Sequence, residues 1–154
     1  MAVIHFYGKR DCINNRRQKE LLRAAGHEII EYDLLRMVVT PEALRPFFEN
    51  RPLVEWFNPT APSIRSGKIR PEQLDEHSAL QQMLFDRLLI RRPLIRIGSE
   101  QFCGFDTDRL RRLIDFTPAA ENRLLFEQLI NKDLVTCPQT GGIDCTVTEE
   151  VYNG

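Results

Sequence analysis

Residues 3–33 read VIHFYGKRDCINNRRQKELLRAAGHEIIEYD, and this stretch decides the fold class. Val3 to Tyr7 is a β-branched and aromatic run that stops at a turn-forming cluster, which predicts a buried first strand. Strong helix formers follow from Ile13 to Ala25, Gly26 stands where a C-terminal cap belongs, and His27 to Asp33 alternates as a second strand. A strand, a helix and a strand within about 30 residues make a βαβ unit, which is parallel and right-handed almost without exception.

The segment after this unit is predicted to consist of helices joined by a loop. Thr40-Pro41-Glu42 places a capping hydroxyl before a proline at the first helical position, so a helix begins there and runs to about Glu49. A short helical piece is expected from Arg51. Two prolines and a glycine between Asn58 and Gly67 predict a loop, and Pro71 to Leu84 is expected to be helical again.

A β-hairpin is predicted next. Leu88 to Ile97 is apolar apart from three arginines, Gly98-Ser99 is a two-residue turn signal, and Gln101 to Phe105 is the partner strand. Asp106 to Phe116 then carries apolar residues at helical spacing. The sequence therefore predicts an α/β fold whose small mixed sheet combines the βαβ unit with the hairpin, with helices inserted between them.

The chain of 154 residues is expected to divide near residue 116. One hydrophobic core is the usual solution at this length, and residues 1–116 contain every strand of the predicted sheet. Pro118 to Lys132 has an apolar stripe at helical spacing, and the sequence after it is polar and rich in threonine and glycine. We therefore expect a domain over residues 1–116 and a C-terminal helix with a polar tail over residues 117–154.

Composition and charge exclude several functional classes. Lys and Arg number 21 against 22 Asp and Glu, so a net charge of -1 gives no global attraction to nucleic acid or to an anionic membrane. The N-terminus lacks the apolar run of a signal peptide, and no stretch approaches the ~20 apolar residues of a membrane span. We expect a cytoplasmic protein with neither a membrane nor a nucleic acid as its direct partner.

Cysteine and histidine spacing predicts no metal site. Cys12, Cys103, Cys137 and Cys145 are the four cysteines, and they form no CxxC pair. This spacing argues against zinc and, in a reducing compartment, against a disulfide framework. The three histidines, His5, His27 and His77, stand apart in the sequence and are expected to have structural roles.

Cys12 is the candidate reactive group. It lies directly after the first predicted strand and directly before a helix, a position that exposes a side chain and points free backbone N–H groups at it. The neighbouring basic residues are Lys9, Arg10, Arg16 and Arg17. Cations in the first turn of a helix oppose its dipole, which indicates an anion or a thiolate nearby. The alternative is that these are solvated surface charges beside an ordinary loop cysteine.

Three residues after Cys12 are candidates for binding an anion. Asn14 and Asn15 carry amide donors, and Arg16 carries a guanidinium. For the asparagines the alternative is a capping role, because asparagine is common near the start of a helix.

A redox cycle at Cys12 needs a second thiol from elsewhere. The sequence Cys12-Ile13-Asn14-Asn15 has no cysteine three residues on, where dithiol oxidoreductases keep the resolving group. Cys103 lies in an aromatic strand and is expected to be an inert core residue. Cys137 and Cys145 could reach back or pair with each other, and the alternative is that both are solvent-facing thiols.

Three motifs in this order resemble one known family. They are FYxKxxCxNxxRQKxLLxxAGH over Phe6 to His27, EWFNPTAPxIxxGxI over Glu55 to Ile69, and LLIRRPL followed by GFD over Leu88 to Asp106. Together they resemble the arsenate reductase family of thioredoxin-like folds, which also contains the Spx regulators, and their wording is similar to the nitrogenase-associated proteins. The resemblance covers roughly residues 2–116.

The resemblance implies roles for particular residues. Cys12 matches the cysteine that attacks arsenate in the glutaredoxin-dependent enzymes, and Arg92 matches one of three arginines that bind the oxyanion. Pro93 is the candidate for the cis proline of thioredoxin-like sites. The two other arginine positions fall at Asn58 and near Gln101, neither of which is cationic.

From the resemblance we expect a nitrogenase-associated protein, a monothiol redox or accessory factor of a nitrogen-fixing bacterium that uses Cys12. It would hold no cofactor, with glutathione or glutaredoxin as reductant, and glutaredoxin, a nitrogenase-system protein or a small oxyanion as partner. The alternatives are a glutaredoxin-dependent arsenate reductase and a non-catalytic binding protein of the Spx kind. Spx proteins switch through a CxxC pair, and Asn15 replaces the second cysteine here.

Overall fold

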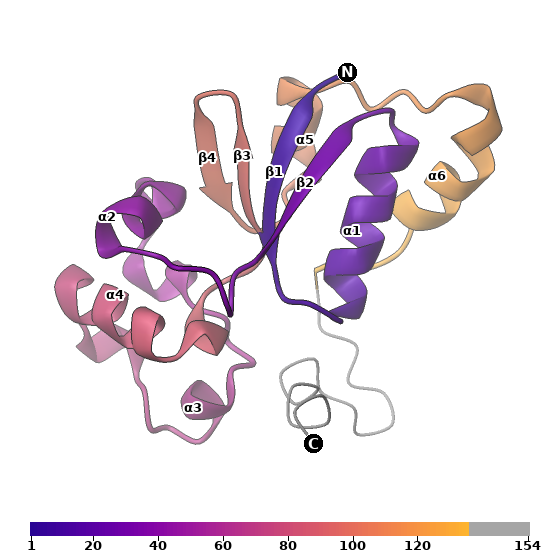
Figure 1. Ribbon diagram of the computed structural model, residues 1–154. Coiled ribbons are helices and arrows are strands. Elements are labelled where there is room, and N and C mark those ends of the chain that lie inside the picture. Colours follow the sequence, from indigo (N-terminus) through magenta and orange to yellow (C-terminus); the bar gives the residue numbers. More distant parts are fainter. Residues whose placement is uncertain (136–154) are drawn as a thin grey trace.

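The sheet has four strands and mixed direction. The computed structural model describes residues 1–135. Its strands are β1 (Val3–Gly8), β2 (Glu28–Asp33), β3 (Leu94–Ile97) and β4 (Glu100–Cys103). They lie in the order β2-β1-β3-β4, with β1 parallel to β2 and antiparallel to β3, and with β3 antiparallel to β4 (Figure 1). The predicted α/β class and its mixed sheet of a βαβ unit and a hairpin are confirmed.

Short helices connect and follow the strands within residues 1–135. The α-helices are α1 (Ile13–Ala24), α2 (Pro41–Leu44), α3 (Pro62–Arg65), α4 (Glu76–Phe85), α5 (Thr107–Leu113) and α6 (Arg123–Ile130). The 3-10 helices are η1 (Arg45–Phe48), η2 (Leu53–Trp56), η3 (Pro71–Gln73), η4 (Arg87–Leu89) and η5 (Ala120–Asn122). Side-chain oxygens cap three α-helices: Thr40 accepts from Ala43 N, Asp75 from Ser78 N, and Asp106 from Arg109 N.

Local polar and proline residues change three of the predicted elements. The stretch predicted as a loop between Asn58 and Gly67 contains the single turn of α3. The helix predicted over residues 71–84 is two pieces, because Asp75 leaves the helical conformation to cap α4. The strand predicted from Leu88 begins only at Leu94, because Asp86 caps η4 and Pro93 has no N–H for the ladder.

The sheet separates two hydrophobic clusters. On one face Ile4 and Phe6 of β1 pack with Leu21 and Leu22 of α1, and with residues of α5 and α6. On the other face residues of β3 and β4 pack with the helices between residues 41 and 89. Figure 1 shows α1 and α6 on one side of the sheet and α2 and α4 on the other. Successive strand residues point to opposite faces, so both sides of this sheet are covered.

Helix α6, the last helix of the described residues, packs against α1. Phe126 and Leu129 of α6 are buried in the same cluster as Leu21 and Leu22 of α1. Through these contacts α6 covers part of α1. The division of the chain at residue 116 stays a prediction.

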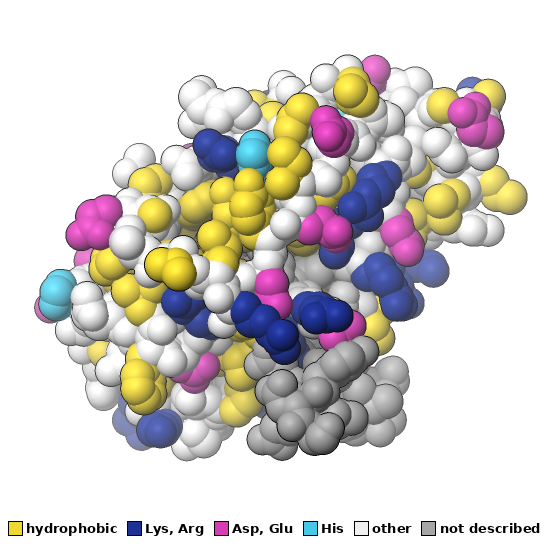
Figure 2. All heavy atoms as spheres, viewed as in Figure 1, with side chains coloured by type: hydrophobic (Ala, Val, Ile, Leu, Met, Phe, Trp, Pro, Cys, Tyr) yellow, Lys and Arg dark blue, Asp and Glu magenta, His cyan; other side chains and the backbone are white. Residues whose placement is uncertain are grey.

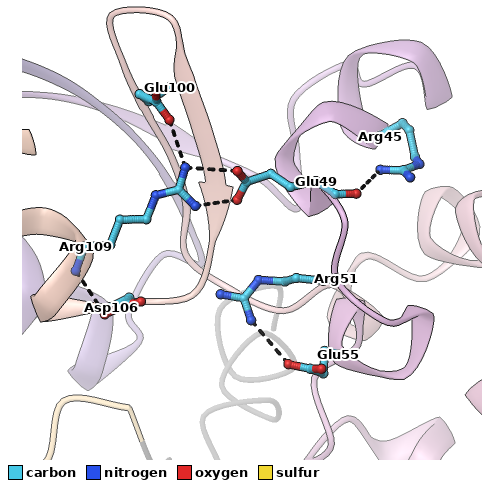
Figure 3. A network of polar contacts seen from close by, with 7 residues as sticks. All are labelled: Arg45, Glu49, Arg51, Glu55, Glu100, Asp106 and Arg109. Carbon is cyan, nitrogen blue, oxygen red and sulfur yellow. Dashed lines mark hydrogen bonds and ion pairs between the residues drawn. The ribbon is translucent and has the colours of Figure 1, made fainter.

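An ionic network joins the hairpin to η1 and α5. Arg109 donates to both carboxylate oxygens of Glu49, at 2.5 and 3.0 Å, and to Glu100 at 2.9 Å (Figure 3). Its guanidinium also lies over the Phe102 ring, 4.4 Å from the centroid. Glu49 has a φ of 50°, and Arg45 donates to its carbonyl oxygen at 2.9 Å. Side chains from three elements therefore hold the chain reversal after η1.

Candidate active site

Cys12 occupies the N-cap of α1. Its backbone is extended, its N–H donates to the carbonyl oxygen of Lys9 at 3.3 Å, and its own carbonyl accepts from Arg16 N at 3.0 Å. The residue before it, Asp11, has a φ of 66°, which turns the chain between β1 and α1. The Cys12 side chain is partly exposed and accepts no capping hydrogen bond from the helix. The thiol therefore lies at a helix N-terminus whose first turn holds no acidic residue.

The start of β3 lies beside the end of β1. Tyr7 pairs with Leu94, so Pro93 lies next to the last residues of β1 and at the same end of the sheet as the loop to Cys12. The peptide bond between Arg92 and Pro93 is cis, the isomer expected at this position. Gly104 N donates to the Pro93 carbonyl at 2.8 Å, which ties this point to the end of β4. Segments about 80 residues apart in the sequence thus meet at one end of the sheet.

Arg92 is held by backbone carbonyls. Its Nη1 lies 3.3 Å from the Arg87 carbonyl oxygen, 3.4 Å from that of Leu88 and 3.3 Å from that of Ile90. These contacts place the partly buried guanidinium against the end of η4, directly before Pro93. Its predicted catalytic role stays a prediction.

Asn15 ties the cysteine loop to α1. Its side chain is buried, its Oδ1 accepts from Lys9 N at 2.9 Å, and its Nδ2 donates to Gln18 Oε1 at 3.0 Å. Gln18 Nε2 in turn donates to the Leu134 carbonyl oxygen at 2.5 Å. This chain of contacts was not predicted from the sequence. The sequence feature that could have indicated these contacts is the polar side chain of Asn15 at the third helical position, where side chains often reach back to the residues before the helix.

The candidate anion-binding residues lie in different environments. Asn14 and Asn15 are buried in the first turn of α1, whereas Arg16 is exposed. Anion binding by Asn14, Asn15 and Arg16 stays a prediction.

A charged hollow of about 300 Å³ borders the same loop. Its charged lining residues are Lys9, Arg10, Lys19, Glu31 and Asp33. Lys19 forms an ion pair with Glu31, and its hydrogen bond lowers the pKa of that carboxyl. Figure 2 shows Lys and Arg side chains near the lower ends of β1 and α1, with acidic side chains among them. The basic character of this region is therefore partly balanced by acids from β2.

The positions matching the missing family arginines have other partners. Asn58 Oδ1 accepts from Thr60 N at 3.1 Å and from Thr60 Oγ1 at 2.8 Å, which makes it a turn residue. Gln101 lies on β4 opposite Arg96. Arg65, at the end of α3, is exposed. Arg96 lies on β3, where its guanidinium contacts His5.

The second cysteine within residues 1–135 and two of the histidines belong to the packing of the fold. Cys103 is fully buried, and burial raises the pKa of its thiol. His27 Nδ1 accepts from Ala2 N at 3.0 Å, and its Nε2 lies 2.5 Å from the Asp115 carbonyl oxygen. His5 contacts the Tyr32 hydroxyl at 2.9 Å. Cys137 and Cys145 lie outside the described residues.

Neither a cluster of metal ligands nor a membrane-spanning helix is present within residues 1–135. No group of His, Cys, Asp or Glu side chains in this part of the chain could hold a metal ion. Within the same residues, every helix is too short or too polar to cross a bilayer.

Comparisons with known proteins identify relatives and fold neighbours. An uncharacterized 15.7 kDa protein in the draG 3′ region of Rhodospirillum rubrum is 48% identical over 106 residues, which cover 69% of this chain and 74% of that protein. An arsenate reductase from Vibrio cholerae has a TM-score of 0.63 at 15% identity, over 73% of this chain and 98% of that one. An ArsC family related protein from Bacteroides fragilis has a TM-score of 0.63 at 18% identity, over 72% and 97%. No protein-family model matches the chain.

Proposed function

This chain belongs to the arsenate reductase-like family of thioredoxin folds, and on that premise we propose that it is a monothiol redox or accessory factor whose reactive group is Cys12. The observation that carries the proposal is the position of the thiol. Cys12 is partly exposed at the N-terminus of α1, and the loop before it leaves the sheet at the end where β3 starts. Helix N-termini favour an anionic sulfur, and the thiolate is the nucleophilic form of cysteine.

The proposed chemistry is thiol–disulfide exchange with a small disulfide such as glutathione disulfide. The Cys12 thiolate attacks one sulfur of that disulfide, the old S–S bond breaks, and the second sulfur leaves as a glutathione thiolate. The product is a mixed disulfide between Cys12 and glutathione. A second glutathione or a glutaredoxin thiol then attacks the glutathione sulfur, which releases Cys12 as a thiolate and forms the new disulfide.

The resolving thiol comes from outside the described fold. Asn15 stands where a dithiol enzyme has its second cysteine, and its amide is committed to Lys9 and Gln18. Cys103 is fully buried on the opposite face of the sheet from α1. The second thiol is therefore that of a separate molecule such as glutathione, or that of Cys137 or Cys145, which lie outside the described residues.

We further propose that the partner belongs to the nitrogenase system. Two observations support this part: the motif resemblance to nitrogenase-associated proteins, and the relative named for the draG 3′ region of Rhodospirillum rubrum. Fold alone does not specify a partner.

The test is glutathionylation of the full chain, mapped by peptide mass spectrometry. Incubation with glutathione disulfide is expected to modify Cys12, and addition of glutathione and glutaredoxin is expected to reverse it. Cys12→Ser removes the modified peptide, and the buried Cys103 peptide serves as the internal control. An unmodified Cys12 in the folded chain would refute the proposal.

Arsenate reduction is the second candidate function, because Cys12 and Arg92 both match the family positions. Two of the three family arginines are absent, and Asn58 is engaged in a turn. Each lost charge-assisted contact weakens oxyanion binding by roughly 1.5 to 3 kcal/mol, together two to four orders of magnitude. An assay with arsenate, glutathione and glutaredoxin tests it, and turnover that survives Cys12→Ser would exclude this mechanism.

A further inference from the structure

A second cavity lies between the sheet and the helices after β2. Its volume is about 360 Å³, and its lining is largely apolar. Apolar residues of the lining include Tyr7, Met37, Val39, Leu44, Phe47 and Leu94. Figure 2 shows hydrophobic side chains gathered in a band between the sheet and α2. Neither Cys12, Arg92 nor Pro93 lines this cavity, so it is distinct from the thiol site.

The lining of the cavity includes one cation, Arg96. Arg96 lies in the middle of the sheet, paired with His5 of β1 on one side and with Gln101 of β4 on the other. Both Arg96 and Gln101 line the cavity. The Nη2 atom of Arg96 lies 3.3 Å from His5 Nδ1, and the Nε atom of Arg96 is buried with no hydrogen-bond partner within residues 1–135. Over the same residues, no carboxylate forms an ion pair with Arg96.

The groups around Arg96 leave its positive charge uncompensated. Burial and the charge of Arg96 both lower the pKa of His5, so this ring is neutral near pH 7 and accepts from the guanidinium. Burial is the main cause that raises the pKa of Tyr7, so its phenol is uncharged as well. A partly buried charge without an ionic partner is unusual in a folded protein.

We propose that this cavity binds a small amphipathic carboxylate. The carboxylate pairs with Arg96 and accepts from the Gln101 amide, while the apolar part lies against Met37, Val39 and Phe47. Charge complementarity selects this occupant, because the lining offers one cation and one amide among mostly apolar side chains. A volume of 360 Å³ falls within the usual range of small-molecule sites, which are also mostly apolar with few polar groups.

Octanoate is the probe for this site. Titration of the full chain, followed by calorimetry and by amide chemical shifts, is expected to show saturable binding with shifts at residues 37–39 and 94–101. Octan-1-ol has the same alkyl chain without the charge and is expected to bind at least tenfold more weakly. Absence of saturable octanoate binding, or octan-1-ol binding as tight as octanoate, would overturn the proposal.

Matched variants separate charge recognition from general effects. Arg96→Gln is expected to weaken octanoate binding about tenfold to a hundredfold, whereas Arg70→Gln removes an exposed arginine elsewhere and leaves the affinity unchanged. Val38→Asp changes a cavity residue that is 92% exposed, so the fold tolerates it while the new carboxylate repels the probe. Equal octanoate affinities for wild type, Arg96→Gln and Val38→Asp would overturn the assignment of this cavity as the binding site. Cys12→Ser leaves octanoate binding unchanged, which distinguishes this site from the proposed thiol chemistry.

Discussion

Replacing Asn15 with alanine tests how the loop that presents Cys12 is held. The substitution removes the acceptor of Lys9 N, at 2.9 Å, and the donor to Gln18 Oε1, at 3.0 Å. Asn15 is 3% exposed and Gln18 is 2% exposed, so water does not readily replace either bond. A buried polar group left without its partner costs about 1 to 3 kcal/mol, and two such groups are stranded. We expect Asn15→Ala to lower the free energy of unfolding by about 2 to 4 kcal/mol.

Urea unfolding and hydrogen exchange measure this effect. For a chain of this size each kcal/mol corresponds to about 2 to 4 °C in Tm, so a shift of roughly 5 to 15 °C is expected. Asn131→Ala is the matched control, because it removes an exposed helix-end bond to the Glu127 carbonyl and is expected to change stability by less than about 0.5 kcal/mol. The Lys9 amide should also exchange faster in Asn15→Ala. A loss below about 0.5 kcal/mol with unchanged Lys9 protection would refute this role.

Three further substitutions probe other contacts. Arg109→Ala is expected to lower the free energy of unfolding by about 1 to 2 kcal/mol, and this loss is expected to be smaller at high salt. Additive effects of Arg109→Ala and Glu49→Gln in a double-mutant cycle would contradict the ionic network. Glu31→Gln is expected to flatten the pH dependence of stability. The pair with Lys19 lowers the pKa of Glu31, so its contribution is present above the ordinary value of 4.5 and is lost as pH falls further. This half-exposed carboxylate contributes under about 1 kcal/mol, and identical acid titration curves for variant and wild type would exclude it. Gly8→Ala places a Cβ 2.8 Å from the Asn15 amide oxygen and is expected to destabilise the loop, as measured by Tm.

The first two strands, the hairpin turn and helix α1 follow from local sequence patterns. The apolar run before Gly8 predicts β1, and the helix-forming residues from Ile13 onward predict α1. Both predictions lie within one residue of the observed ends. The turn at Gly98 places the hairpin correctly, since it joins β3 to β4. These features depend on periodicity and turn chemistry within a few residues, which a single sequence displays.

The contacts that complete the site depend on residues far apart in the chain. The bond from Gln18 to the Leu134 carbonyl spans 116 positions. The cavity near Arg96 forms where β1, β3 and β4 pack against the segment after β2. No local sequence pattern predicts this long-range packing. The sequence shows a proline at position 93, but it does not show where β3 begins. That start also depends on the capping of η4 by Asp86.

The reactivity of Cys12 shows whether this thiol is the functional nucleophile. Its rate of alkylation by iodoacetamide in the folded full chain is compared at neutral pH with the rate of the isolated peptide KRDCINN, residues 9–15. We predict a faster reaction in the folded chain, because helix N-termini in general favour an anionic sulfur, and a return to the peptide rate in denaturant. A folded chain in which Cys12 reacts no faster than the peptide would contradict the assignment of Cys12 as the functional nucleophile.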